Sequence, residues 1–143
     1  MQMDIAARHP TLARYRDKIV TATEAVSCIA PGNRVFVGTA SATPRSLIRA
    51  MEQSDTPLPD VQIWSFLTHG AVRHENGIPK TRYRHRCFFV GSDVRIATAQ
   101  GMADYIPVSL AQVPQLIENG RIPVDVALIQ VSLPDEYGYV SLG

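Results

Sequence analysis

Short apolar runs alternate with amphipathic segments along this chain, and that alternation restricts the fold more than any other feature. Short, β-branched apolar runs are typical of strands, whereas apolar positions three or four residues apart are typical of helices. Strands that alternate with helices form parallel sheets, because a parallel connection is long enough to hold a helix. The pattern predicts one domain over residues 1–143, a three-layer α/β/α fold with an open, mainly parallel sheet and helices on both faces.

Local signals give the bounds of the expected elements. We expect strands at residues 34–38, 61–67, 87–90, 104–108 and 124–131, and helices at residues 9–20, 21–29, 44–53, 93–100 and 109–119. Thr21 and Ser109 begin capping boxes, and Thr43 and Ser92 are the expected N-caps of two other helices. The continuous run at 124–131 suits a strand buried on both faces. Residues 71–83 form a polar stretch without periodicity.

Composition excludes several classes of protein. Hydrophobic residues make up 45% of the chain, which is too many for an intrinsically disordered protein. No run approaches the roughly 18 apolar residues of a membrane span. The net charge of +1 gives no general attraction to nucleic acid or to an anionic membrane. Two cysteines, Cys28 and Cys87, and a start without a secretion signal lead us to expect a cytoplasmic protein with reduced thiols.

Ligands in open α/β sheets bind at the carboxyl ends of the strands, which directs attention to the loops that follow them. The loop after the first strand, residues 38–44, is made of small residues and leads into a helix. Such a loop can expose N–H groups to a phosphate or an oxyanion. Because it lacks GxGxxG and P-loop spacing, the pattern alone favours an ordinary connecting loop. His69 also follows a strand, beside Gly70, where a loop hydrogen bond is its commoner role.

Other chemistry-bearing residues give weaker signals. The four histidines, His9, His69, His74 and His85, lack metal-ligand spacing, so we expect no metal site. No serine lies in a GxSxG motif, so a serine triad has no support. The adjacent carboxylates of Asp135 and Glu136 do not form an acid–base pair, and Asp135 is expected to organise a turn.

Basic residues recur at every second position in one segment: Lys80, Arg82, Arg84 and Arg86. On a strand they would share one face. They could bind an anionic ligand such as a nucleotide phosphate, or nucleic acid with Tyr83 stacking on a base. They could also protect a solvated edge strand from aggregation. We favour the edge strand, because the net charge leaves no broad positive field.

Three stretches of the second half resemble the acetyl-CoA hydrolase/transferase family, which includes 4-hydroxybutyrate CoA-transferases. They are Phe88-Phe89-Val90-Gly91 with Val94-Arg95, residues 103–116 beginning Ala103-Asp104-Tyr105, and residues 123–143 with Pro134-Asp135-Glu136 and Ser141-Leu142-Gly143. The loop at 38–44 also resembles the small-residue loop of the family. The resemblance covers about residues 16–143.

The resemblance implies the amino-terminal half of a two-domain enzyme, with an active site between this domain and a catalytic carboxy-terminal domain. Its substrates would be an acyl-CoA and a small carboxylate, with coenzyme A as a substrate and no tightly bound cofactor. In the family, a glutamate of the second domain attacks the acyl-CoA. No glutamate here matches that motif: Glu24, Glu52, Glu75, Glu118 and Glu136. We therefore assign no catalytic residue to this chain and expect it to be inactive alone.

The resemblance also suggests which residues line the active site. Gly38, Thr39, Ala40 and Ser41 would form a wall beside the thioester carbonyl. Five further residues are expected to line the same cleft: His69, Gly70, Ser132, Asp135 and Gly138.

Two functions of other classes remain as alternatives. One is a stand-alone module that binds CoA or another phosphorylated ligand through residues 38–44 and 80–86. The other is an interaction domain whose sheet edge pairs with a partner. Assembly into a homo-oligomer is left open.

Overall fold

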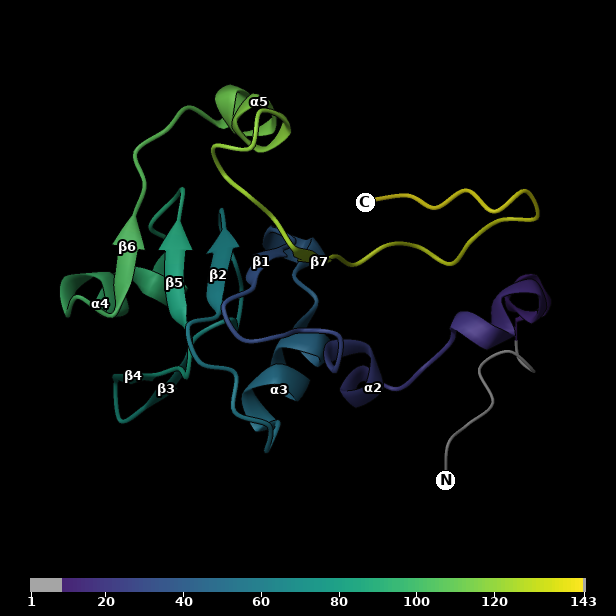
Figure 1. The fold of residues 1–143 in the computed structure, drawn as a ribbon, viewed down its shortest axis with the longest axis horizontal. Helices are drawn as coiled ribbons and strands as arrows, with labels where there is room; N and C mark the ends of the chain where they lie inside the picture. The colour runs from purple at the N-terminus through teal and green to yellow at the C-terminus, as the bar shows by residue number, and fades with distance from the viewer. Residues whose placement is uncertain (1–8, 143) are drawn as a thin grey trace.

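The computed structural model describes residues 9–142, and its centre is a sheet of five parallel strands (Figure 1). The strands lie in the order β6-β5-β2-β1-β7. Their bounds are Arg34–Val37 for β1, Gln62–Ser65 for β2, Arg84–Cys87 for β5, Ala103–Tyr105 for β6 and Val126–Leu128 for β7. Every neighbouring pair is parallel. The predicted α/β architecture is therefore confirmed.

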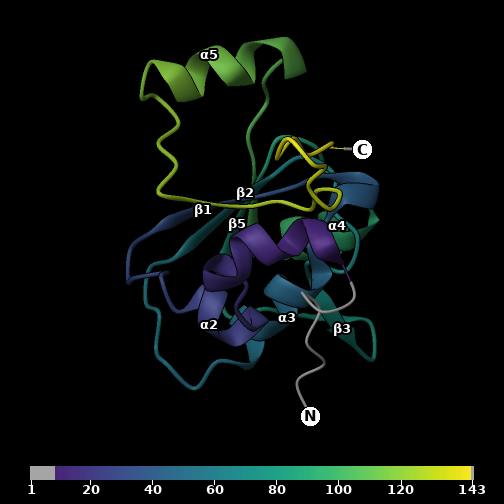
Figure 2. The ribbon, with the colours of Figure 1, turned by 90° about the vertical axis from the view of Figure 1, so that its right-hand side faces the viewer.

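The direction of each connection decides which face its helix covers. Helix α3 (Arg45–Gln53) joins β1 to β2, and α4 (Ser92–Ala99) joins β5 to β6. Both connections advance the same way across the sheet, so right-handed crossovers place both helices on one face. The chain returns from β6 to β7 in the opposite direction, which puts α5 (Val113–Glu118) on the other face. Figure 2 shows α5 on one side of the sheet, with α3 and α2 (Ala22–Val26) on the other.

Side chains alternate between two cores on either side of the sheet. Val35 and Val37 of β1 pack with Ile48 and Met51 of α3. Phe36 of β1 points the other way, because successive residues of a strand face opposite sides. It packs in a second core with Trp64, Phe88 and, from the segment around α5, Val113 and Ile122.

Strand β5 differs from the prediction in both bounds and position. It begins at Arg84 rather than Cys87, and it lies between β2 and β6, so the edge-strand interpretation is wrong. The neighbouring strand supplies the missing countercharge. Arg84 Nε donates to Asp104 Oδ2 at 2.9 Å, and Arg86 Nη1 lies 3.5 Å from the same oxygen. The Arg86 guanidinium also lies 5.6 Å from the centre of the Trp64 ring.

The polar stretch without periodicity at residues 71–83 contains a hairpin. Strands β3 (Arg73–Glu75) and β4 (Ile78–Lys80) pair antiparallel across Asn76 and Gly77. Both turn residues have positive φ, 52° and 77°, as a tight hairpin turn requires. The Asn-Gly pair was the signal in the sequence, since three-residue strands are too short to show periodicity.

Two capping predictions are right and two are wrong. Glu24 N donates to Thr21 Oγ1 at 3.2 Å and Thr21 N to Glu24 Oε2 at 2.8 Å, and Ser109 N bonds Gln112 Oε1 at 3.4 Å. Thr43 and Ser92 are not N-caps, because Pro44 and Gly91 hold those positions. The hydroxyl of Thr43 instead donates a hydrogen bond to Ala40 O at 2.7 Å.

Strand β7 is shorter and less buried than predicted. It pairs with β1 alone among the described strands, and Ala127 in its middle is exposed. The apolar residues that follow, such as Ile129 and Val131, leave the sheet and are largely exposed. The expectation of a strand buried on both faces is therefore wrong.

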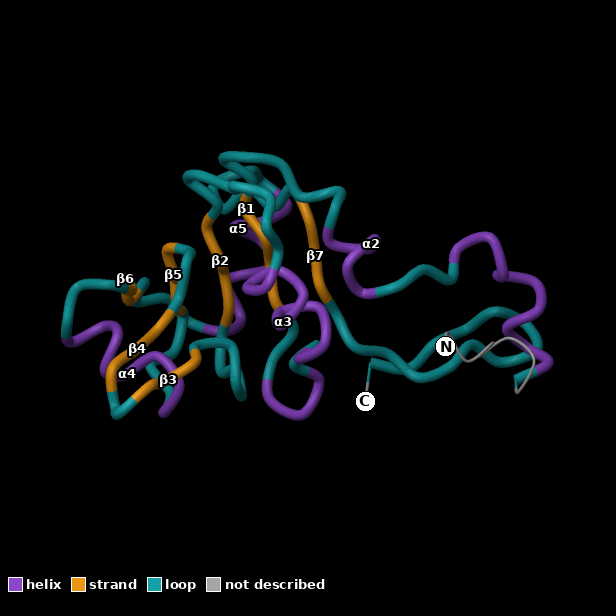
Figure 3. The backbone as a smooth tube through the Cα atoms, turned by 90° about the horizontal axis from the view of Figure 1, so that it is seen from below, coloured by secondary structure: helices purple, strands orange, loops and turns teal. Residues whose placement is uncertain are grey.

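Beyond β7, residues 129–142 form an arm that projects from the sheet and turns back on itself (Figures 1 and 3). Ser132 N donates to Ser141 O at 2.9 Å across its two limbs. The 3₁₀ helix η1 (Pro10–Lys18) lies beside it, where we expected a helix at residues 9–20. Arg14 Nη1 donates to Glu136 O at 2.9 Å. Among the described helices, none has both the length and the apolar character needed to cross a membrane.

Candidate active site

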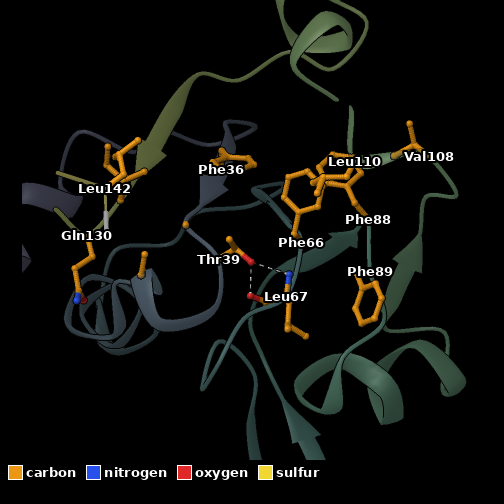
Figure 4. Close-up of a pocket in the computed structure, with 13 residues that line it drawn as sticks. Phe36, Thr39, Phe66, Leu67, Phe88, Phe89, Val108, Leu110, Gln130 and Leu142 are labelled. Atoms are coloured by element: carbon orange, nitrogen blue, oxygen red, sulfur yellow. Dashed lines mark hydrogen bonds between the residues drawn. The ribbon is translucent and has the colours of Figure 1, made fainter. Parts of the chain in front are cut away.

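A largely apolar pocket of about 570 Å³ lies at the carboxyl ends of β1, β2, β5 and β7 (Figure 4). It is lined by Phe36, Gly38, Thr39, Ala42, Phe66, Leu67, Phe88, Phe89, Val108, Leu110, Ile129, Gln130 and Leu142. The loops after β1 and β7 meet here, where the direction of the connections across the sheet reverses. Open α/β sheets bind ligands at such a reversal.

Aromatic rings that pack edge to face or at a tilt form one wall of the pocket. Phe36 and Phe66 meet edge to face with ring centres 6.3 Å apart, and Phe66 and Phe88 lie 4.9 Å apart. The centre of the Trp64 ring lies 5.7 Å from that of Phe88. Rings that pack against one another keep a fixed position, so this wall has a defined shape and suits an apolar ligand group.

The small-residue loop forms another wall, and Thr39 attaches it to the end of β2. Thr39 Oγ1 donates to Leu67 O at 2.7 Å and accepts from Leu67 N at 3.1 Å, as Figure 4 shows. Ala40 N also donates to Leu67 O, at 2.6 Å. Gly38 has no room for a side chain, because a Cβ there would lie 2.8 Å from the Ala42 carbonyl oxygen. The loop is therefore both fixed and tightly packed.

Several N–H groups of this loop are already used within the protein. Gly38 N donates to Leu128 O at 2.9 Å and Ala42 N to Thr39 O at 3.0 Å, in addition to the Ala40 bond. These three groups are not free to bind a phosphate or an oxyanion. The loop offers a ligand mainly a close-fitting surface.

Three of the four predicted wall residues, and the predicted cleft residue Ser132, line two adjoining hollows, whereas Ala40 lines neither. Gly38 and Thr39 line the apolar pocket. Ser41 and Ser132 line a hollow of about 330 Å³, which adjoins the pocket through Ala42, Gln130 and Leu142.

Other predicted cleft residues lie apart from the pocket. His69 is exposed, and its backbone N–H donates to Thr43 Oγ1 at 3.3 Å. Gly70 lines a separate cavity beside α3. Asp135 and Gly138 belong to the arm, where Asp135 Oδ1 accepts from Tyr137 N and Tyr139 N at 2.9 Å each. Asp135 thus organises a turn, as the sequence predicted.

A buried histidine lies on the opposite face of the sheet. His85 is 1% exposed, and its Nε2 lies 2.9 Å from Thr81 Oγ1, which donates to Glu52 Oε1 at 3.1 Å. Its Nδ1 has no partner among the described residues. Burial lowers the pKa of His85 to about 4, although Asp93 acts in the opposite direction. Its surroundings therefore keep His85 neutral at physiological pH.

The remaining nucleophiles and possible metal ligands give no further site. Burial raises the pKa of the Cys87 thiol to about 11, so it carries little thiolate. Within residues 9–142, no three His, Cys, Asp or Glu side chains are grouped to hold a metal ion.

Sequence reasoning missed the aromatic wall. Phe36, Phe66 and Phe88 all belong to runs whose pattern predicts only strands, at residues 34–38, 61–67 and 87–90. The available signal was their position on the strand face opposite Val35 and Val37. That face is covered by α5, but towards the carboxyl ends of the strands it stays open.

Comparisons with known proteins agree with this architecture. Residues 3–143 match the model of the acetyl-CoA hydrolase/transferase N-terminal domain. The chain is 39% identical over 129 residues to the 4-hydroxybutyrate coenzyme A transferase of Clostridium kluyveri, covering 90% of this chain and 30% of that protein. It is 29% identical to a succinyl-CoA:acetate/propanoyl-CoA:succinate CoA transferase of Fasciola hepatica, covering 94% of this chain and 28% of that protein.

Solved structures give the same result. The crystal structure of RipA from Yersinia pestis matches with a TM-score of 0.74 and 27% identity, over 93% of this chain and 33% of that one. The chain thus spans about a third or less of the length of the relatives it matches. It belongs to the acetyl-CoA hydrolase/transferase family, of which it represents the N-terminal domain.

Proposed function

We propose that this chain supplies one half of the active site of a CoA-transferase, which exchanges CoA between an acyl-CoA and a carboxylate. The observation that carries the proposal is the apolar pocket at the strand ends, bounded by the loop that resembles the small-residue loop of the family. The acyl group of the thioester would lie against Phe66 and Phe88. Gly38, Thr39, Ala40 and Ser41 would form the wall beside its carbonyl.

The nucleophile is proposed to come from the carboxy-terminal domain. Its glutamate carboxylate attacks the thioester carbonyl, which forms an acyl-glutamyl anhydride and releases the CoA thiolate. That thiolate then attacks the glutamyl carbonyl, which gives a glutamyl-CoA thioester and frees the original acid. The acceptor carboxylate repeats both steps in reverse and leaves as the new acyl-CoA. Four easier covalent steps replace one difficult exchange. A hydrolase would use water as the acceptor.

The rim of the pocket suits coverage by that second domain. Phe89, Leu110 and Leu142 are 57%, 70% and 68% exposed, although all three line the pocket. Apolar side chains gathered around a pocket mark an interaction surface. Covering them would exclude water from the thioester, which the exchange reaction requires.

The stand-alone phosphate module proposed from residues 38–44 and 80–86 has less support. Arg84 and Arg86 are engaged by Asp104, and Lys80 lies in the separate hairpin. Three N–H groups of the 38–44 loop are also occupied, at Gly38, Ala40 and Ala42.

The experiment joins this chain to the carboxy-terminal part of the Clostridium kluyveri enzyme and measures CoA exchange between acetyl-CoA and 4-hydroxybutyrate. We expect exchange by the joined protein and none by the chain alone. Phe66→Ala should lower the exchange rate, whereas Asp55→Asn, an exposed change remote from the pocket, should not. Turnover by the chain alone would contradict the proposal. So would a joined protein that melts cooperatively but stays inactive.

A further inference from the structure

A second cavity, of about 440 Å³, lies between α3 and the segment that follows β2. Its lining residues are Arg45, Ile48, Arg49, Glu52, Gln53, Gly70, Ala71 and Arg73. The α3 residues recur three or four apart, so they share one face of the helix. None of these residues lines the apolar pocket. The cavity is therefore distinct from the apolar pocket to which the proposed CoA exchange assigns the acyl group.

Three arginines of this cavity lack the partners that other arginines have. Arg34 is paired with Asp125, and Arg84 with Asp104. Arg82 donates to the carbonyl oxygens of Glu52 and Ser54. Within residues 9–142, the guanidinium groups of Arg45, Arg49 and Arg73 have neither a hydrogen bond nor an ion pair. Five described arginines share this property, and three of them line one cavity; the other two are Arg95 and Arg121.

Glu52 is the one acidic residue that lines the cavity, and its carboxylate is hydrogen-bonded to Thr81. Glu52 Oε1 accepts a hydrogen bond from Thr81 Oγ1 at 3.1 Å. Partial burial raises the pKa of Glu52, although Arg82 and Arg73 act in the opposite direction. Three arginines and one partly buried carboxylate thus line the cavity, which gives its lining an excess of positive charge.

We propose that this cavity binds an organic anion that carries two or more phosphate groups. A guanidinium presents its N–H groups as a planar fork that matches phosphate oxygens, which makes arginine the usual residue for this chemistry. Arg45 and Arg49 approach from α3 and Arg73 from β3, so phosphates would be held from two sides. Ile48 and Ala71, both buried, supply an apolar floor for the rest of the ligand. The volume lies within the range of small-molecule sites.

The test measures binding of inorganic pyrophosphate to this chain by calorimetry. The double variant Arg49→Ala/Arg73→Ala should weaken binding by about a hundredfold, since each lost charge-assisted contact costs about tenfold. The matched control is Arg95→Ala/Arg121→Ala, which removes the same charge from arginines elsewhere and should change affinity less than twofold. Melting without ligand checks that both variants fold. Absence of saturable binding, or equal losses in the two variants, would overturn the proposal.

A variant with the opposite expected effect strengthens the test. Glu52→Gln removes the carboxylate, so it should tighten pyrophosphate binding severalfold. Unchanged or weaker binding by this variant, with the fold intact, would contradict the charge argument. Phe66→Ala should leave pyrophosphate binding unchanged, which separates this site from the proposed CoA exchange.

Competition identifies the source of the phosphates. If CoA displaces pyrophosphate and phosphate-free pantetheine does not, the site holds the phosphates of CoA. If ADP displaces pyrophosphate and CoA does not, the site holds a free nucleotide. Either result supports a polyphosphate site. If pantetheine displaces pyrophosphate as effectively as CoA does, the result would contradict a polyphosphate site.

Discussion

The hydroxyl of Thr39 is bonded to both backbone groups of Leu67: it donates to the carbonyl at 2.7 Å and accepts from the N–H at 3.1 Å. This pair of bonds fixes the loop after β1 against the end of β2. Both residues line the apolar pocket, so the relationship defines where two of its walls meet. Thr39, which the resemblance marked as part of the predicted wall, thus also anchors the loop to the neighbouring strand end.

Thr39→Val keeps the shape of the side chain but removes the hydroxyl. It should lower the free energy of unfolding by about 1 kcal/mol, because Leu67 N loses its acceptor. Thr39→Ser keeps the hydroxyl and should stay closer to the wild type. Urea denaturation of the three proteins checks this. A loss of stability in Thr39→Ser with none in Thr39→Val would show that the methyl group matters rather than the hydroxyl.

Gly38→Ala should destabilise the same loop by a different mechanism. The new Cβ would lie 2.8 Å from the Ala42 carbonyl oxygen, a backbone atom that moves only with the loop. Overpacking of this kind costs about 1–3 kcal/mol. A urea midpoint equal to that of the wild type would mean that the loop can relax freely.

The stability of the protein should fall as the pH drops from about 6.5 to 4 because of His85. Its pKa is lowered to about 4 in the folded state, so the unfolded chain binds the proton first and gains stability over this range. The cost approaches about 3 kcal/mol at pH 4. His85→Leu should remove that part of the pH dependence, whereas His74→Gln, at an exposed position, should not. Identical pH profiles for wild type and His85→Leu would refute this role.

Asp125 should act in a lower pH range. Its hydrogen bonds from Arg34, at 2.8 Å from Nε and 2.7 Å from the backbone N, lower its pKa to about 2. The stability that this pair contributes is present above about pH 4 and is lost as the pH falls towards 2. Thermal midpoints measured from pH 5 to 2 should therefore fall less steeply in Asp125→Asn than in the wild type. Parallel curves would show that the pair adds nothing.

The architecture could be predicted from the sequence because most strands and helices are marked by patterns within their own residues. Thr21 and Glu24 carry a complete capping box within four residues, and β1 and β2 are short apolar runs that need no partner to be recognised. The position of β5 inside the sheet could not be predicted from its own residues. Its alternating arginines suit an edge strand until Asp104, on the next strand along the chain, supplies their countercharge.

In the candidate site, too, one part could be predicted from local sequence and the rest depends on the fold. The loop at Gly38 was found from the rule that ligands bind at strand ends. The aromatic wall depends on Phe36, Phe66 and Phe88 meeting across three strands, which only the register of the sheet decides. The arginine cavity depends on the hairpin that brings Arg73 towards α3, and three-residue strands leave too little pattern to predict it.

The most direct test of the account measures the affinity of this chain for acetyl-, propanoyl- and butyryl-CoA by calorimetry. If the apolar pocket holds the acyl group, each added methylene should tighten binding by about fourfold, because burying one contributes roughly 0.8 kcal/mol. The same series with Phe66→Ala should show a weaker dependence on chain length. Equal affinity for all three thioesters, or a dependence that survives Phe66→Ala unchanged, would contradict the assignment of this pocket to the acyl group.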